Sequence, residues 1–123
     1  MDLEALTGRI LNAAFRVHSV MGPELLESVY EAALAHELRK AGLRIATQVE
    51  VPVVFDGVKL DIAFRADIIV ESLVILELKS VEALAPVHSK QLLNYLRLSG
   101  LKVGLLLNFN TISLKDQLVR LVG

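Results

Sequence analysis

Residues 64–79, FRADIIVESLVILELK, contain two short apolar runs joined by little more than Glu71-Ser72. Their content of Val, Ile and Leu favours two β-strands, and the short connection favours an antiparallel hairpin. Because side chains alternate along a strand, Glu77 and Lys79 share one face of the second run, opposite its leucines. An acid and a lysine that end an apolar strand together are the first indication of a functional site.

The register of this hairpin decides whether Asp67 lies beside Glu77 and Lys79. A two-residue loop would pair Asp67 with Leu76 and bury the aspartate on the apolar side. A three-residue loop, or one bulge, pairs Asp67 with Glu77 instead. Since an unpaired buried carboxylate is costly, we predict the odd register, with Asp67, Glu77 and Lys79 on one face of the sheet.

The rest of the chain alternates between helical and strand patterns. Apolar spacing predicts helices over residues 3–20, from 23 or 24 to 41, and 87–99, with glycine or proline at their ends. Further strands are expected at residues 43–55, 58–60 and 101–109, with Asp56-Gly57 as a hairpin turn, and residues 114–122 form a short helix or strand. This order predicts an α/β fold with a mixed sheet flanked by helices. No linker divides the chain, so residues 1–123 are expected to form a single domain.

The composition excludes several classes of protein. The 123 residues are 54% hydrophobic and 22% charged, which is incompatible with a disordered chain. No apolar stretch approaches the roughly 20 residues that span a bilayer, and the N-terminus lacks the pattern of a secretory signal. The absence of cysteine excludes disulfides and thiol chemistry. We therefore expect a soluble cytoplasmic protein without membrane contact, and the apolar excess predicts a homo-oligomer.

Charge is distributed unevenly along the sequence. The formal net charge of -1 gives no argument for nucleic-acid binding. Residues 83–115, however, contain no acid, and their basic side chains are His88, Lys90, Arg97, Lys102 and Lys115. A local positive surface attracts phosphates even when the whole chain is nearly neutral. The alternative is that this stretch lacks acidic residues by chance and has no role in binding.

The three polar residues of the hairpin suit one kind of chemistry. Two carboxylates offer the hard oxygen ligands that Mg²⁺ or Mn²⁺ prefers. A neighbouring ammonium group, such as that of Lys79, can position a water molecule and stabilise charge on a phosphate. The alternative is a cross-strand salt bridge between Lys79 and one of the acids, worth less than about 1 kcal/mol at a surface.

Several spaced motifs carry a resemblance to a known family. They are GPELLESVY (residues 22–30), FRAD (64–67), ELK (77–79) and QLLNY (91–95). In this order they resemble the GxxExxY protein family, a compact branch of the PD-(D/E)xK nuclease superfamily, over nearly the whole chain. The sequence departs from the pattern at Glu24, which stands where the naming motif has its glycine, and at Asp61 or a neighbour, where a glycine is common.

The resemblance implies a restriction-endonuclease-like fold, with a central antiparallel hairpin, and a magnesium-dependent nuclease activity. It implies that Asp67, Glu77 and the Leu78 carbonyl hold Mg²⁺ or Mn²⁺, and that Lys79 is the catalytic lysine. By the same resemblance, Glu27 matches the acid of the helix before the sheet, and Gln91 matches the glutamine of the later helix.

Helical spacing adds expectations that do not depend on the family. Glu27 falls at the edge of the apolar sector of its helix, where a metal site or Arg65 would give it a partner. The alternative is a solvated glutamate near the positive helix N-terminus.

On the later helix, His88, Gln91 and Tyr95 form a polar stripe that can reach the site or the substrate. Lys90 and Arg97 point toward solvent or a phosphate backbone. Tyr95 and Tyr30 could stack on bases, although core packing is the favoured interpretation.

The sequence therefore predicts a magnesium-dependent nuclease that acts on DNA or RNA. Its predicted substrate-binding residues are Arg65, His88, Lys90, Tyr95 and Arg97. One alternative is a non-catalytic binding or assembly module that retains the nuclease fold. Hydrolysis of a small phosphorylated metabolite is a third possibility.

Overall fold

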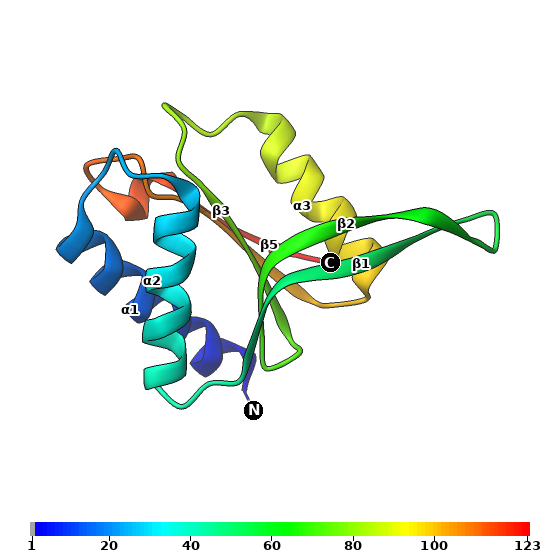
Figure 1. The fold of residues 1–123 in the computed structure, drawn as a ribbon, viewed down its shortest axis with the longest axis horizontal. Coiled ribbons are helices and arrows are strands. Elements are labelled where there is room, and N and C mark those ends of the chain that lie inside the picture. Colours follow the sequence, from blue (N-terminus) through cyan, green and yellow to red (C-terminus); the bar gives the residue numbers. More distant parts are fainter. Residues whose placement is uncertain (1) are drawn as a thin grey trace.

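The structure, a computed structural model, describes residues 2–123 and contains one five-stranded mixed sheet (Figure 1). The strands lie in the order β1-β2-β3-β4-β5, and every neighbouring pair is antiparallel except β3 and β4. In chain order the elements are α1 (Leu3–Met21), α2 (Glu27–Lys40), β1 (Ile45–Phe55), β2 (Val58–Val70), β3 (Val74–Lys79), α3 (Pro86–Ser99), β4 (Val103–Asn108), a 3₁₀ helix (Leu114–Gln117) and β5 (Leu118–Val122).

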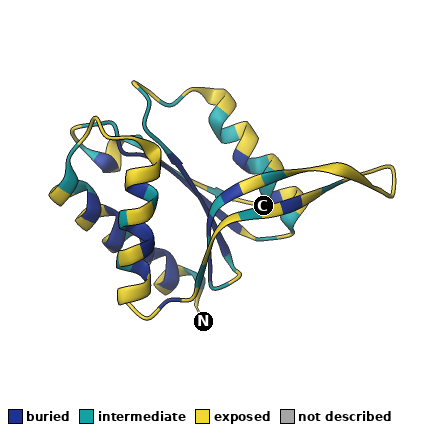
Figure 2. Ribbon diagram, viewed as in Figure 1, coloured by how far each residue is buried: buried dark blue, intermediate teal, exposed yellow. Residues whose placement is uncertain are grey.

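Helices cover both faces of this sheet (Figures 1 and 2). One core lies between the sheet and the pair α1 and α2, and includes Leu34, Leu76 and Leu105. The second core lies on the α3 side and includes Ile75, Leu92 and Leu106. Because both faces are covered, β3 and β4 are almost completely buried, which accounts for their unbroken apolar runs. The α/β prediction with a mixed sheet flanked by helices is confirmed.

The hairpin between β2 and β3 has the predicted odd register. Val70 pairs with Val74 and Ile68 with Leu76, so Glu71, Ser72 and Leu73 form a three-residue loop. Glu71 and Ser72 both have left-handed backbones, with φ of 53° and 54°, which reverses the chain tightly. The regular pairing stops at Ile68, and the next two opposed residues are Asp67 and Glu77.

Two elements differ most from the sequence prediction, and the other bounds shift by one or two residues. Helix α2 begins at Glu27, because residues 23–26 form an irregular connection in which Glu24 has φ of 70°. Strand β2 runs without interruption from Val58 to Val70, where the sequence predicted two separate runs. Its first half is exposed on both faces, so no burial constraint imposes an alternating pattern there.

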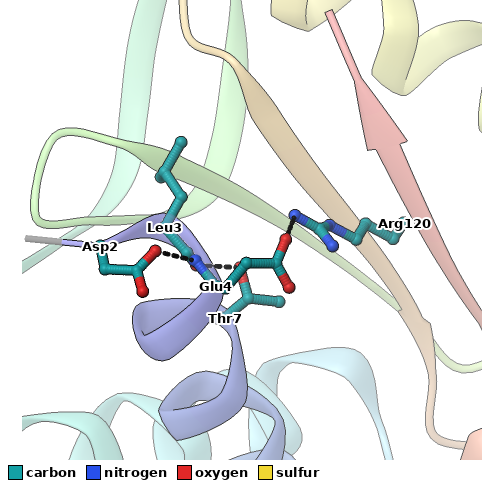
Figure 3. A network of polar contacts seen from close by, with 5 residues as sticks. All are labelled: Asp2, Leu3, Glu4, Thr7 and Arg120. Carbon is teal, nitrogen blue, oxygen red and sulfur yellow. Dashed lines mark hydrogen bonds and ion pairs between the residues drawn. The ribbon is translucent and has the colours of Figure 1, made fainter.

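Polar contacts fix the N-terminus of α1 to the C-terminal strand (Figure 3). The Asp2 carboxylate accepts a hydrogen bond from the Glu4 amide at 3.0 Å and caps the helix. The Glu4 carboxylate in turn accepts a hydrogen bond from the Arg120 guanidinium of β5 at 2.7 Å. One turn further on, the Thr7 hydroxyl donates to the Leu3 carbonyl.

Tyr30 is a core residue, as the favoured interpretation of its sequence context predicted. It is fully buried and stacks on Phe109 with 4.7 Å between the ring centroids. Its hydroxyl donates to the Gly22 carbonyl and accepts from the Leu25 amide, so it secures the connection before α2. Among residues 2–123, no helix is both long and apolar enough to cross a bilayer.

Candidate metal and catalytic site

The candidate site begins where β2 and β3 separate. The Leu78 amide donates a hydrogen bond to the Asp67 carboxylate at 2.8 Å, and the Asp67 amide donates to the Glu77 carboxylate at 3.3 Å. Each carboxylate thus accepts from the backbone of the opposite strand. This reciprocal arrangement replaces the regular ladder and brings the two acids together, as the odd register requires.

The two carboxyl groups share a poorly solvated site. Glu77 is only 7% exposed, and burial raises its pKa to about 8, with the charge of Asp67 as the next cause. Burial also raises the pKa of Asp67, against the lowering effects of the Leu78 hydrogen bond and the Lys79 charge. A buried and a half-buried carboxylate this close together favour a shared proton or a bound cation over two free negative charges.

The Leu78 carbonyl lies at the same edge of β3. In a strand, the N–H and C=O of one residue point to the same side. The Leu78 N–H points to Asp67, whereas the neighbouring Lys79 carbonyl accepts from Phe109 beyond β4 at 2.9 Å. The Leu78 carbonyl therefore faces the gap that opens between β2 and β3.

Lys79 lies beside the acids without forming an ion pair. Its positive charge lowers the pKa of both Asp67 and Glu77, which places its ammonium group in their vicinity. Among residues 2–123, however, neither acid comes within 4.0 Å of it, so the alternative of a simple cross-strand salt bridge is not realised. The side chain is half-buried and available to other partners.

Glu27 differs in part from its prediction. As the first residue of α2 it is exposed, so it does not lie half inside the core face. Arg65 is not its partner, because the Arg65 guanidinium pairs with Glu50 of β1 at 3.4 Å. The Glu27 charge nevertheless contributes to the raised pKa of Glu77, which places Glu27 at the margin of the site.

Two further residues, Gln48 and Glu31, lie at the site, and neither was predicted. Gln48 of β1 donates a hydrogen bond from Nε2 to the Glu31 carboxylate of α2 at 2.6 Å. A side-chain hydrogen bond from Gln48 also lowers the pKa of Asp67. Gln48 therefore links Asp67 to α2, from a backbone with φ of 51°. The one sequence signal for Gln48 is that it is a polar residue within the apolar run of residues 43–55.

Helix α3 contributes Tyr95 to the candidate site. Tyr95 stacks on Phe64 of β2, with centroids 3.6 Å apart and planes 6° from parallel. Its pKa is raised by burial and then by the charges of Glu77 and Asp67, so its hydroxyl lies near both acids. The Phe64 contact means that one face of the ring is already occupied.

The other predicted residues of α3 do not gather at the acids. His88 accepts a hydrogen bond from the Ala85 amide on Nδ1 at 3.0 Å and caps the helix. Gln91, Lys90 and Arg97 are exposed, and within residues 2–123 no ion pair or side-chain hydrogen bond joins them to Asp67 or Glu77. The roles predicted for His88, Lys90 and Arg97 in substrate binding, and for Gln91 in the catalytic site, stay predictions.

The donor set fits a hard divalent cation. Within residues 2–123, no three acidic or histidine side chains are grouped to hold a metal on their own. The candidate ligands are therefore two carboxylates, Asp67 and Glu77, and the Leu78 carbonyl. All three are oxygen donors, the type that Mg²⁺ and Mn²⁺ prefer, and a dication would balance the two negative charges.

Comparison with known proteins shows the superfamily and agrees with the fold. The family model described as "PD-(D/E)XK nuclease superfamily" matches residues 4–121, and the chain belongs to that superfamily. The mixed sheet with its flanking helices is the restriction-endonuclease-like fold of these nucleases.

A solved structure described as "Crystal structure of SSO0001" is also similar, at 25% identity and a TM-score of 0.52. The match covers 76% of this chain and 47% of that one, so this chain corresponds to about half of its relative. A search of curated proteins found no significant match.

Proposed function

We propose that this protein is a Mg²⁺- or Mn²⁺-dependent nuclease that hydrolyses phosphodiester bonds in DNA or RNA. The proposal is supported above all by the Asp67–Leu78 hydrogen bond, which brings two carboxylates and a backbone carbonyl to one opening in the sheet. Membership of the PD-(D/E)XK superfamily gives the same donor set a precedent.

Each residue of the site has a distinct role in this proposal. Asp67, Glu77 and the Leu78 carbonyl would hold the ion, which when bound supplies positive charge to the scissile phosphate and acidifies water. The Lys79 ammonium group orients the attacking water and stabilises negative charge on the phosphate. Glu27 and Gln91 support the outer side of the site, from α2 and α3 respectively.

The substrate would approach along the surface that α3 and β2 provide. Arg65, Lys90 and Arg97 are exposed cations suited to phosphate contacts. Tyr95 offers a polar contact near the acids, and His88 offers one at the N-terminus of α3. Because Tyr95 already stacks on Phe64, we expect it to position a substrate group by its hydroxyl and not by base stacking.

The finer assignment to the GxxExxY family also belongs to this proposal. Glu27 and Tyr30 occupy the last two positions of that motif, and Tyr30 secures the connection before α2 through its hydroxyl. The position where the motif has glycine, Glu24, has φ of 70°, a conformation that favours glycine. The backbone thus retains the geometry that the motif would require.

A direct assay tests the activity. Purified protein is incubated with labelled single- and double-stranded DNA and RNA in Mg²⁺ or Mn²⁺, beside Lys79→Ala. We expect cleavage of at least one substrate by the natural sequence and a loss of about a hundredfold or more in the variant. Equal cleavage by both proteins would show that the activity comes from a contaminant or from other residues.

The same samples separate the nuclease from a non-catalytic module with the same fold. In calorimetric titration with Mn²⁺, a nuclease should bind the ion and lose this binding in Asp67→Ala. No binding by the natural sequence would favour the module. Hydrolysis of a nucleotide, but of neither DNA nor RNA, would instead indicate a small phosphorylated substrate.

A further inference from the structure

Asn108 is a buried polar side chain that the proposed chemistry does not use. It ends β4, has no exposed surface and lies opposite Lys79 in the pairing of β3 with β4. Ile75 of β3 and Leu106 of β4 pack in the core on the α3 side, and by strand alternation Lys79 and Asn108 face the same way. The buried amide therefore lies on the same face of the sheet as the candidate site, on the strand next to its lysine.

The Asn108 amide uses all four of its hydrogen-bonding positions. Oδ1 accepts from the Val81 amide at 3.1 Å and from the Asn110 amide at 3.3 Å. Nδ2 donates to the Val81 carbonyl at 2.9 Å and to Gln117 Oε1 at 3.0 Å. A primary amide offers two donors and two acceptor positions, so this side chain is fully satisfied and held in one orientation.

Val81 is bound by this amide at both of its backbone groups. The backbone ladder between β3 and β4 ends where the Phe109 amide donates to the Lys79 carbonyl at 2.9 Å. Two residues further on, the Val81 N–H donates to the Asn108 side chain and the Val81 carbonyl accepts from it. The side chain thus takes the place of a further strand residue and continues the ladder beyond Lys79. These two hydrogen bonds are called the Val81 clamp below.

The clamp acts at the start of an irregular connection. Residues 80–85 contain no helix or strand and lead from β3 to α3 (Figure 1). The Ser80 hydroxyl donates to the Leu25 carbonyl at 2.6 Å, which fixes a side chain. The Val81 clamp instead fixes the N–H and the C=O of one residue. It therefore sets the direction in which the chain leaves Lys79.

The position of the Lys79 ammonium group depends on this backbone. Among residues 2–123, Lys79 forms no ion pair within 4.0 Å, so no carboxylate holds its half-buried side chain in place. We propose that Asn108 is a positioning residue, which holds Lys79 through Val81 in the place that the cleavage reaction needs. The proposal rests on the nuclease function proposed above.

Asn108→Leu removes the Val81 clamp with little change in side-chain size. On a labelled DNA or RNA that the natural sequence cleaves, we expect kcat to fall about tenfold or more, because a misplaced catalytic group costs rate. KM and the Kd for Mn²⁺ should each stay within about threefold, because no group that binds substrate or ion is removed. An unchanged kcat, or a loss that appears in KM alone, would overturn the proposal.

Gln117→Ala is the matched control within the same hydrogen-bond network. It removes a partner of Asn108 Nδ2 and of the Leu84 amide, which donates to Gln117 at 3.1 Å. Both bonds to Val81 remain, so kcat should stay within about twofold of the natural value. An equal loss of kcat in both variants would mean that any disturbance at this end of the sheet lowers the rate, and the specific role of Asn108 would be wrong.

A double-mutant cycle tests whether Asn108 acts through Lys79. In single-turnover assays, Asn108→Leu should lower the rate about tenfold when Lys79 is present and less than about twofold in the Lys79→Ala background. The reason is that a lysine that is absent cannot be misplaced. Equal losses in both backgrounds would show that Asn108 acts on other groups, which contradicts the proposal.

Amide hydrogen exchange measured by NMR reports on the Val81 clamp without any activity. The Val81 amide should exchange at least about tenfold faster in Asn108→Leu, and at the natural rate in Gln117→Ala. Unchanged exchange in Asn108→Leu would overturn the clamp. Circular dichroism shows whether Asn108→Leu folds. If it does not, the same expectations apply to Asn108→Ser, whose shorter side chain cannot bind both groups of Val81.

Failure of this proposal can be distinguished from failure of the nuclease function. If the natural sequence cleaves none of the labelled substrates, the nuclease function is wrong and the catalytic role of Asn108 falls with it. If the natural sequence cleaves and Asn108→Leu cleaves equally well, only the role of Asn108 is wrong.

Discussion

The Leu78 amide donates its hydrogen bond to the side chain of Asp67, at 2.8 Å, and not to a backbone carbonyl of β2. The consequence is that β3 keeps a partner for its N–H at the point where β2 separates from β3. The carboxylate is thereby fixed against the backbone, with Glu77 beside it and the Leu78 carbonyl facing the same gap. One hydrogen bond accordingly serves both the fold and the candidate site.

Asp67→Asn separates these two functions. The amide oxygen can still accept from the Leu78 N–H, so we expect the melting temperature to change by no more than about 5 °C. The charge that would hold a cation is lost, so Mn²⁺ binding measured by calorimetry should fall by about a hundredfold or more. Asp116→Asn, an exposed acid, is the control and should bind Mn²⁺ normally. Unchanged binding by Asp67→Asn would remove Asp67 from the site.

Glu77 gives a pH-dependent prediction for the metal-free protein. Its pKa is raised from 4.5 to about 8 in the folded state, mainly by burial. Between these values the folded protein binds more protons than the unfolded chain, so stability falls as the pH rises. We expect the free energy of unfolding in a chelator to decrease between pH 5 and pH 8.

The matched variant is Glu77→Gln, which has nearly the same shape but no titrating proton at this position. Denaturant unfolding of the variant should show a smaller loss of stability over the same pH range, and at pH 8 the variant should be the more stable protein. Parallel pH profiles for both proteins would mean that Glu77 does not titrate in the buried state.

Gln48 illustrates what the sequence could and could not predict. Strand alternation and the cost of burying Asp67 were enough to predict the hairpin register and the convergence of three polar residues. The bond from Gln48 to Glu31 joins residues that are remote in sequence, and no local pattern specifies it. The exposed position of Glu27 likewise depends on where α2 begins. The irregular segment at residues 23–26 sets that start, and the apolar spacing of the helix does not specify it.

Gln48→Gly tests whether the side chain positions Asp67. Glycine relieves the left-handed backbone at φ of 51°, and this gain offsets the lost hydrogen bonds, so stability should change by less than about 1 kcal/mol. Asp67 loses a neighbour that orients it, so Mn²⁺ affinity should fall about tenfold. Ser72→Gly relieves a similar φ of 54° at an exposed loop and should leave the affinity unchanged. Equal affinities in both variants would limit Gln48 to a structural role.

The connection before α2 carries a backbone cost that one substitution should remove. Glu24 has φ of 70°, which is unfavourable by about 1–2 kcal/mol for a residue with a Cβ. Glycine removes this strain, but it also gives the unfolded chain more conformational freedom, which offsets part of the gain. Glu24→Gly should therefore stabilise the protein by about 0.5–1 kcal/mol. The Glu24 amide keeps its bond to the Asn110 side chain in the variant, because only the side chain changes. Denaturant unfolding should show a higher midpoint at an unchanged slope. Glu24→Ala keeps the Cβ and should show no such gain, and an equal gain in both variants would mean that the glutamate side chain, not the backbone, is the source of the cost.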